Sequence, residues 1–198
     1  MNSRAIFIDR DGTLNEMVYD SNHGIFDSPM LPEQVKLKQG AVDLVRGAKA
    51  LGYKIIIITN QPGIAKGTLK LSDLEKINEK IINSIGKEFI DDIIVCPHHP
   101  KGLLDPNSPY IMECDCRKPK PGMLIQAANK HSIDLSRSLM IGDGITDVQA
   151  GKAVGCKTML VADIKLEHFQ KFKELKILPD IIVATLSEAL SKIYIFNT

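Results

Sequence analysis

The feature that most constrains the fold is the apolar run Ala5-Ile6-Phe7-Ile8, which is followed at once by Asp9, Asp11 and Gly12. An apolar run cut off by acidic residues and a glycine predicts a buried strand that ends in a tight loop. Ligands bind beyond the carboxyl ends of the strands in an open parallel sheet, so we expect Asp9 and Asp11 at the mouth of a site. The alternative is a plain Asp-Gly turn after a strand.

These two carboxylates suit a particular chemistry. Carboxylates this close repel each other unless a cation lies between them, and Mg²⁺ with oxygen ligands is the usual solution. A carboxylate can also take a phosphoryl group and form an acyl phosphate. Asp9 and Asp11 are therefore candidate magnesium ligands and catalytic residues, and the rest of the chain decides between this hypothesis and the plain turn.

Apolar runs and amphipathic segments alternate along the rest of the chain. This alternation predicts a doubly wound, Rossmann-like α/β fold with a parallel sheet, which we expect to form a single domain over residues 1–198. The runs predict strands at 54–58, 92–95, 138–141, 158–161 and 180–183. The helical spacing predicts helices at 40–51, 71–89, 121–132, 145–154, 165–174 and 186–193.

Residues 14–39 show little periodicity, and we expect them to form a long loop. The loop follows Asp11 closely, so it is a candidate cover for the substrate pocket. Tyr19 and Asp20 are candidate substrate-binding residues within it, and a solvated loop without contacts is the alternative.

The bulk properties narrow the class of protein. A chain of 198 residues is long enough for one substantial core. The net charge of +1 gives no electrostatic case for a nucleic-acid or membrane partner. The first residues carry no apolar leader, and no apolar run reaches membrane-spanning length, so we expect a cytoplasmic protein. Four cysteines in such a protein indicate metal binding or reactive thiols before disulfides.

A dispersed set of polar residues matches the needs of phosphoryl transfer. The reaction requires an in-line nucleophile, a metal, and cationic or hydrogen-bonding groups around the phosphoryl oxygens. Thr59 and Asp143 each end a predicted strand, and Lys118 precedes a predicted helix. Asp147 lies one helical turn after Asp143, as a second magnesium ligand or an outer-shell carboxylate. Each of these residues, taken alone, is also explained as a turn residue, a helix cap or a surface charge.

A compact set of thiols and imidazoles predicts a zinc site. Cys96 and His98 form one close pair, and Cys114 and Cys116 form the other. Three thiolates and one imidazole complete a tetrahedral, closed structural zinc centre, with His99 as the alternative to His98. Reduced, unliganded cysteines are the competing interpretation. Cys156 stands apart and is expected to be a small core residue.

These motifs together resemble the haloacid dehalogenase superfamily. The resemblance rests on four segments that span most of the chain: Asp9-Arg10-Asp11-Gly12-Thr13, Thr59-Asn60-Gln61, Lys118, and Gly142-Asp143-Gly144-Ile145-Thr146-Asp147. The segments Cys96-Pro97-His98-His99-Pro100 and Cys114-Asp115-Cys116-Arg117-Lys118-Pro119 resemble its zinc-loop subgroup and favour His98 as the ligand. That subgroup includes D-glycero-D-manno-heptose 1,7-bisphosphate phosphatases and histidinol-phosphate phosphatases, and it lacks a large cap domain.

The resemblance implies a role for each matching residue. Asp9 would be the nucleophile that forms an aspartyl-phosphate, and Asp11 the general acid and base. Mg²⁺ would be held by Asp9, the backbone carbonyl of Asp11, and Asp143. The residues that would stabilise the phosphoryl group or bind substrate are Thr59, Lys118, Arg10, Asn60, Gln61 and Arg117.

The resemblance also implies a substrate and a setting. Asn60-Gln61-Pro62-Gly63 and His98-His99 are more similar to the heptose enzymes, so we expect a monomeric phosphatase that converts the heptose 1,7-bisphosphate to the heptose 1-phosphate. Histidinol phosphate or another small phosphorylated metabolite is the alternative substrate. Residues 15–40 are longer than in heptose phosphatases, and Gly144 stands where the heptose enzymes commonly have a charged residue; both departures bear on the substrate and not on the reaction class. The near-neutral net charge of the chain does not support a DNA 3′-phosphatase. A zinc-stabilised binding module without catalytic activity would not need Asp9, Asp11, Lys118 and Asp143 to be intact.

Overall fold

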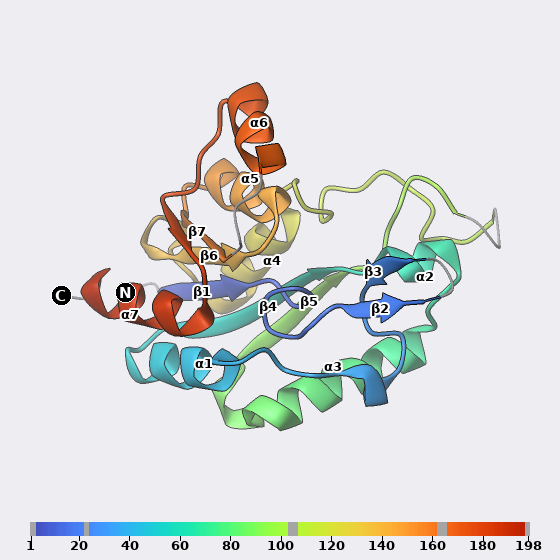
Figure 1. Ribbon diagram of the computed structural model, residues 1–198, viewed down its shortest axis with the longest axis horizontal. Coiled ribbons are helices and arrows are strands. Elements are labelled where there is room, and N and C mark those ends of the chain that lie inside the picture. The colour runs from blue at the N-terminus through green and yellow to red at the C-terminus, as the bar shows by residue number, and fades with distance from the viewer. Residues whose placement is uncertain (1–2, 22–23, 103–106, 162–165, 197–198) are drawn as a thin grey trace.

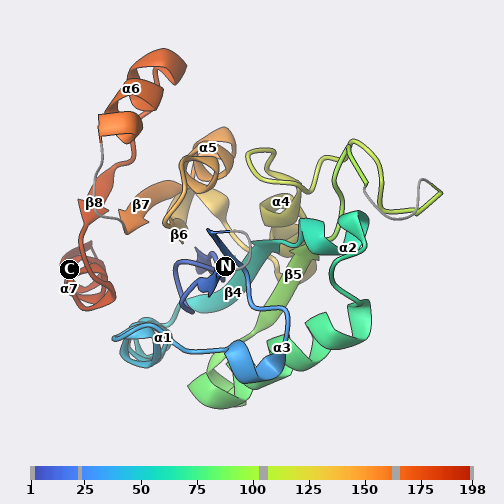
Figure 2. The ribbon, with the colours of Figure 1, turned by 45° about the vertical axis from the view of Figure 1, so that its right-hand side comes forward.

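The computed structural model describes residues 3–21, 24–102, 107–161 and 166–196 (Figure 1). Within these ranges a six-stranded parallel sheet has the order β5-β4-β1-β6-β7-β8, which Figure 2 shows edge to edge. The strands are β1 (Ala5–Ile8), β4 (Lys54–Asn60), β5 (Asp92–Cys96), β6 (Leu139–Gly142), β7 (Lys157–Val161) and β8 (Ile181–Val183). The doubly wound α/β prediction is confirmed, and β1 lies between β4 and β6.

Helices cover both faces of this sheet (Figure 1). One face carries α1 (Ala41–Ala50), α3 (Leu71–Ile85) and α7 (Leu186–Phe196). The other face carries α4 (Gly122–His131) and α5 (Ile145–Ala153). The helix α6 (Leu166–Leu175) packs outside α5 and β7 through Phe172.

The core follows from the period of two along each strand. Ile6 and Ile8 of β1 pack toward α1, α3 and α7, whereas Ala5 and Phe7 pack toward α4 and α5. The four isoleucines of β4, Ile55–Ile58, are all fully buried, as expected for a central strand covered on both faces. Each fully buried isoleucine contributes about 1.5–3 kcal/mol, so these runs hold the strand ends, and the residues after them, in fixed positions.

The structure corrects several expected elements. The segment 14–39 is not a loop throughout, because it contains the antiparallel hairpin of β2 (Val18–Asp20) and β3 (Ile25–Asp27). The short helix α2 (Pro62–Lys66) was not predicted. The helix expected at 71–89 ends at Ile85, since Gly86 has a φ of 115° that does not continue a helix. The helix expected at 165–174 begins at Leu166, and residue 165 lies outside the described residues.

The carboxyl ends of the strands carry small structures rather than a cap domain. In Figure 1 the β2–β3 hairpin, α2 and the segment before α4 lie beyond the carboxyl end of β1. Among the described residues, the chain from β1 to α1 holds only the hairpin and one 3-10 turn (Pro32–Gln34), and the chain from β5 to α4 holds no helix or strand. None of the helices in the described part of the chain is long and apolar enough to cross a membrane.

Candidate active site

The strand order β4-β1-β6 brings the predicted polar residues to one edge. Asp9 directly follows β1, Thr59 lies near the end of β4, and Asp143 directly follows β6. A carboxylate oxygen from each of Asp9, Asp143 and Asp147 lies within 4.8 Å of the others. The set of carboxylates expected from the strand ends is therefore brought together.

Lys118 is the buried cation of this cluster. Its Nζ lies 2.6 Å from Asp9 Oδ1 and 2.7 Å from Asp147 Oδ1, and it also donates to the carbonyl of Ile58 at 3.2 Å. Burial lowers the pKa of Lys118, but the two carboxylates outweigh burial and raise it above its usual value. Lys118 thus stays charged and places a fixed positive charge against Asp9.

Asp147 is held by this cation and by the start of α5. Its Oδ2 accepts a hydrogen bond from the backbone N–H of Gly144 at 3.0 Å, and its side chain is 2% exposed. Burial raises the pKa of Asp147, and Lys118 opposes that rise. Its contacts fit a residue that positions Lys118, in line with the outer-shell alternative.

The acidic cluster has more negative charge than Lys118 alone neutralises. Burial raises the pKa of Asp9 to about 7, and the charges of Asp147 and Asp11 add to the rise that Lys118 opposes. Burial and the neighbouring Asp9 raise the pKa of Asp143 as well. Carboxylate oxygens from two strand ends form a donor set of the kind that Mg²⁺ binds, and a divalent cation would offset this repulsion.

Gly12 is required for the close approach of the β1 loop to Asp143. Its φ is +84°, and a Cβ at this position would lie 2.3 Å from Asp143 Oδ2. The hydroxyl of Thr13 donates to Asp143 Oδ1 at 3.1 Å. The Asp-Gly-Thr sequence therefore packs the loop directly onto Asp143.

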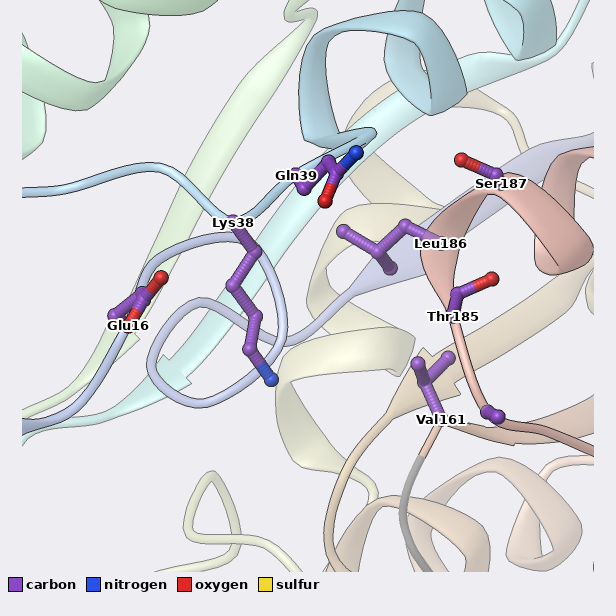
Figure 3. A pocket seen from close by; sticks show the side chains of 8 residues that line it. Glu16, Lys38, Gln39, Val161, Thr185, Leu186 and Ser187 are labelled. Atoms are coloured by element: carbon purple, nitrogen blue, oxygen red, sulfur yellow. The ribbon is translucent and has the colours of Figure 1, made fainter.

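Lys38 lies at the site, but no pattern in the sequence predicts this position for it. Its Nζ donates to the carbonyl of Gly12 at 2.6 Å, and its charge opposes the rise in the pKa of Asp143 that burial and Asp9 cause. Figure 3 shows the Lys38 side chain in a pocket of about 340 Å³, together with Val161 and Thr185. Lys38 belongs to no motif and reaches Gly12 from 26 residues away, so only the fold reveals it.

Asp11 is held by three side chains. Arg10 donates to both its oxygens, at 3.0 Å and 2.8 Å, Asn15 donates at 2.9 Å, and Gln61 donates at 2.7 Å. Burial raises the pKa of Asp11, but the Arg10 charge and these hydrogen bonds outweigh it and hold the pKa below its usual range. Asp11 is therefore ionised at neutral pH in this structure.

Arg10, Asn60 and Gln61 contact other site residues, and their expected contact with substrate stays a prediction. Arg10 is fully buried beneath Asp11. Gln61 is 1% exposed and donates to Thr59 Oγ1 as well as to Asp11. The Asn60 amide makes two hydrogen bonds with the backbone of Lys118, at 3.0 Å and 3.1 Å. In this structure these side chains orient other site residues.

The four predicted zinc ligands also come together. The three sulfur atoms of Cys96, Cys114 and Cys116 lie 3.1–3.6 Å apart, and His98 Nδ1 lies 3.2 Å from Cys116 Sγ and 3.8 Å from Cys96 Sγ. Ligand atoms about 2.0–2.3 Å from a tetrahedral zinc ion are separated by similar distances, so the residues fit Zn²⁺. His99 Nδ1 instead contacts the backbone of Lys101, which selects His98. Cys156 is buried elsewhere in the core.

The remaining candidates flank the site. Arg117 donates to the carbonyl of His98 at 3.3 Å, at the junction of the zinc cluster and Lys118. Tyr19 and Asp20 lie in β2, where the ring of Tyr19 is 57% exposed and lies 5.2 Å from that of Phe26. Their contact with a substrate stays a prediction.

Comparisons with known proteins place this architecture in a family. The family described as HAD-hydrolase-like matches residues 115–189. The D-glycero-beta-D-manno-heptose-1,7-bisphosphate 7-phosphatase of Pasteurella multocida is 38% identical over 161 residues, which cover 80% of this chain and 81% of the relative. The enzyme of the same name from Escherichia coli K12 is 36% identical, over 79% of this chain and 78% of its own.

A solved structure agrees with these relatives. The D,D-heptose 1,7-bisphosphate phosphatase of B. bronchiseptica, complexed with magnesium and phosphate, superposes with a TM-score of 0.73 and 25% identity, over 96% of this chain and 98% of its own. The chain therefore belongs to the haloacid dehalogenase-like hydrolases, in the family of these curated phosphatases.

Proposed function

We propose that this enzyme is a Mg²⁺-dependent phosphatase that converts D-glycero-D-manno-heptose 1,7-bisphosphate to the heptose 1-phosphate. The observation that carries the proposal is the placement of Asp9. Its carboxylate lies 2.6 Å from the buried Lys118 ammonium, and one of its oxygens lies within 4.8 Å of an Asp143 oxygen, so that one metal ion could bind both carboxylates. The names of the relatives supply the substrate class. Without the Lys118 and Asp143 contacts, Asp9 would be an ordinary residue of a turn.

In this reaction Asp9 is the nucleophile. Its carboxylate attacks phosphorus, an aspartyl-phosphate forms, and the bond from phosphorus to the sugar oxygen breaks while Asp11 gives that oxygen a proton. Water then attacks the aspartyl-phosphate, Asp11 takes a proton from the water, and phosphate leaves as Asp9 is restored. Thr59 and Lys118 stabilise the charge on the phosphoryl oxygens.

The ionisation of Asp11 sets a condition on the first step. Arg10 and the surrounding hydrogen-bond donors hold its pKa low, which suits the base that it becomes in the second step. A bound phosphate ester brings negative charge next to this carboxylate and raises its pKa, which makes the acid form accessible. Asp11 thus requires substrate before it can act as an acid.

The metals have separate roles in the proposal. The residues that would hold Mg²⁺ are Asp9, Asp143 and the backbone carbonyl of Asp11. When bound, Mg²⁺ supplies positive charge that neutralises the phosphoryl oxygens. Zn²⁺ would be held by Cys96, His98, Cys114 and Cys116 in a closed structural centre. That centre would order the segment that delivers Arg117 and Lys118.

Substrate selection is assigned to the residues that border Asp9. We assign substrate contacts to the guanidinium of Arg117, which lies beside the Cys/His cluster, and to Tyr19 and Asp20 in the β2–β3 hairpin. The exposed aromatic face of this hairpin is the feature that favours the second candidate, histidinol phosphate, which carries an imidazole ring. Both candidates share the same phosphoryl chemistry.

The proposal extends to the setting of the enzyme. We assign residues 1–198 to a single phosphatase domain that works as a monomer in the cytoplasm, without a nucleic-acid partner. The net charge of +1 fits a small phosphorylated sugar better than a polyanion.

Phosphate release tests the proposed function directly. The wild-type protein with Mg²⁺ should release one phosphate from heptose 1,7-bisphosphate and leave the 1-phosphate. Asp9→Asn should release none, because its amide is not a competent nucleophile. If the wild type and Asp9→Asn were equally inert on every phosphorylated metabolite, the chain would be a binding module instead.

A further inference from the structure

The buried face of α3 contains one polar residue, Asn78, whose hydrogen-bond partner holds the catalytic Asp11. Leu74, Ile77, Ile81 and Ile85 form the apolar stripe that packs on the sheet, and Asn78 interrupts it. Asn78 is only 9% exposed. Burying a polar side chain in such a stripe costs free energy unless a hydrogen-bond partner compensates for the lost water. The hydrogen-bond partner of Asn78 therefore indicates the role of Asn78.

That partner is Arg10. The Arg10 Nη1 donates to Asn78 Oδ1 at 2.7 Å across 68 residues of sequence, in a contact that is fully buried. The other two bonds of this guanidinium go to Asp11, and the Arg10 side chain has no exposure to solvent. Asn78 therefore anchors the side of the guanidinium that faces away from Asp11.

A buried guanidinium needs this third acceptor. A charged group without solvent is strongly destabilised when a partner is removed, and it then moves or draws in water. Arg10 has a planar fork whose donors are fixed relative to one another, so movement at Nη1 also rotates the two donors that hold Asp11. The orientation of the Asp11 carboxylate thus depends on a residue that does not touch it.

We propose that Asn78 is a positioning residue of the active site: it fixes Arg10, and Arg10 holds the Asp11 carboxylate in the orientation that protonates the leaving group. The inference rests on the proposed function, because it assigns Asn78 to the acid step of that reaction. It predicts that Asn78 matters most for substrates whose leaving oxygen needs a proton.

Two substrates separate this role from a purely structural one. A sugar oxygen is a poor leaving group and needs the proton from Asp11, whereas the phenolate of p-nitrophenyl phosphate leaves without it. The value of kcat/KM reports the steps through cleavage of the ester bond, so it isolates the acid step from the later hydrolysis. The measurement is kcat/KM for heptose 1,7-bisphosphate and for p-nitrophenyl phosphate, with Mg²⁺.

Asn78→Leu removes the acceptor and keeps the volume. We expect kcat/KM to fall roughly tenfold on the heptose substrate, a fraction of the 10²–10⁴ that a general acid contributes, and to change less than about threefold on the aryl substrate. Asn78→Ala makes the same test without an added apolar group, should the leucine variant not fold. Asn78→Asp keeps an oxygen facing Arg10 and should restore the heptose reaction to within about threefold of wild type.

Ile81→Val is the matched control. Ile81 lies on the same buried face of α3 and packs into the apolar core, and its substitution should lower stability without favouring either substrate. An equal fall in kcat/KM on both substrates in a folded Asn78 variant, or no fall on the heptose substrate, would overturn the proposed role of Asn78 and leave the proposed function intact. A wild type that releases phosphate from neither substrate would overturn the proposed function, and the role of Asn78 with it.

Discussion

At the scale of single residues, the site depends on opposite environments for two carboxylates that lie two positions apart. Burial raises the pKa of Asp9 to about 7, while Arg10 and its neighbours outweigh burial at Asp11 and lower its pKa. A Mg²⁺ ion held by Asp9 would lower the pKa of that carboxylate and keep it in the ionised form that a nucleophile requires. Asp9 is the carboxylate beside Lys118, and Asp11 is the one surrounded by donors.

Asp11→Asn tests that division of roles. We expect kcat on the sugar phosphate to fall about 10²–10⁴-fold, because an amide supplies no proton and accepts none from water. The aspartyl-phosphate should accumulate when the enzyme is given an activated aryl phosphate, which rapid quench and acid-stable label would detect. Turnover within about threefold of wild type would contradict the acid–base assignment.

The contributions of individual residues were only partly predictable from the sequence. Asp9, Thr59 and Asp143 were identified because each ends an apolar run, and parallel strands bring their ends to one edge. The burial of Arg10 was missed, since arginine is rarely fully buried and nothing local marks the exception. Lys38 was missed because its contact with Gly12 is set by the path of the chain.

At the scale of elements, the segment between β5 and α4 has no described helix or strand of its own and carries three members of the cluster, with Cys96 at the end of β5 as the fourth. A segment with so little packing would gain much of its order from a bound zinc ion. The strands of the central sheet were predicted from their apolar runs, whereas the β2–β3 hairpin was not predicted. Its strands have three residues each and β3 is exposed, so neither shows a usable period.

Zinc content tests the element-scale account. Purified wild-type protein should contain about one tightly held zinc ion per chain by elemental analysis. Cys116→Ser should lose most of this zinc and lower the melting temperature, because it removes one of four ligands. Cys156→Ala is the control, since Cys156 lies outside the cluster, and it should keep its zinc. No zinc in carefully prepared wild type would refute the site.

The β7–β8 pair carries a testable pH dependence. Asp180 accepts hydrogen bonds from the N–H and hydroxyl of Thr158 at 2.7 Å and 2.8 Å and pairs with Lys152. Partial burial raises its pKa, but these partners outweigh burial and lower it. An aspartate whose pKa is lowered by folding adds stability above its unfolded pKa of about 3.9, and that stability disappears as pH falls through the folded value.

Asp180→Asn therefore should behave differently at two pH values. We expect it to lower the free energy of unfolding by about 1 kcal/mol at pH 7, the difference between charged and neutral hydrogen bonds at a partly exposed site. The gap between variant and wild type should close as pH falls below about 4. Urea denaturation at both pH values measures this, and a gap that does not change with pH would contradict the proposed ion pair.

At the scale of the whole molecule, the central sheet brings Asp9, the buried Lys118 and the carboxylates of Asp143 and Asp147 to a single edge. The segment between β5 and α4 and the β2–β3 hairpin border that edge in place of a cap domain (Figure 1). The fold was predictable because buried parallel strands read as continuous apolar runs. The substrate was not, because the segments that border the site, the β2–β3 hairpin and the chain between β5 and α4, have conformations that periodicity does not predict.

A side-by-side measurement of kcat/KM for heptose 1,7-bisphosphate and histidinol phosphate, with Mg²⁺, tests the central claim most directly. We expect a preference for the heptose of about a hundredfold or more, which corresponds to roughly 2.7 kcal/mol of differential transition-state binding. The reverse preference would contradict the heptose assignment and make the β2–β3 hairpin the reason, while no phosphate release from either substrate would contradict the phosphatase account of this site.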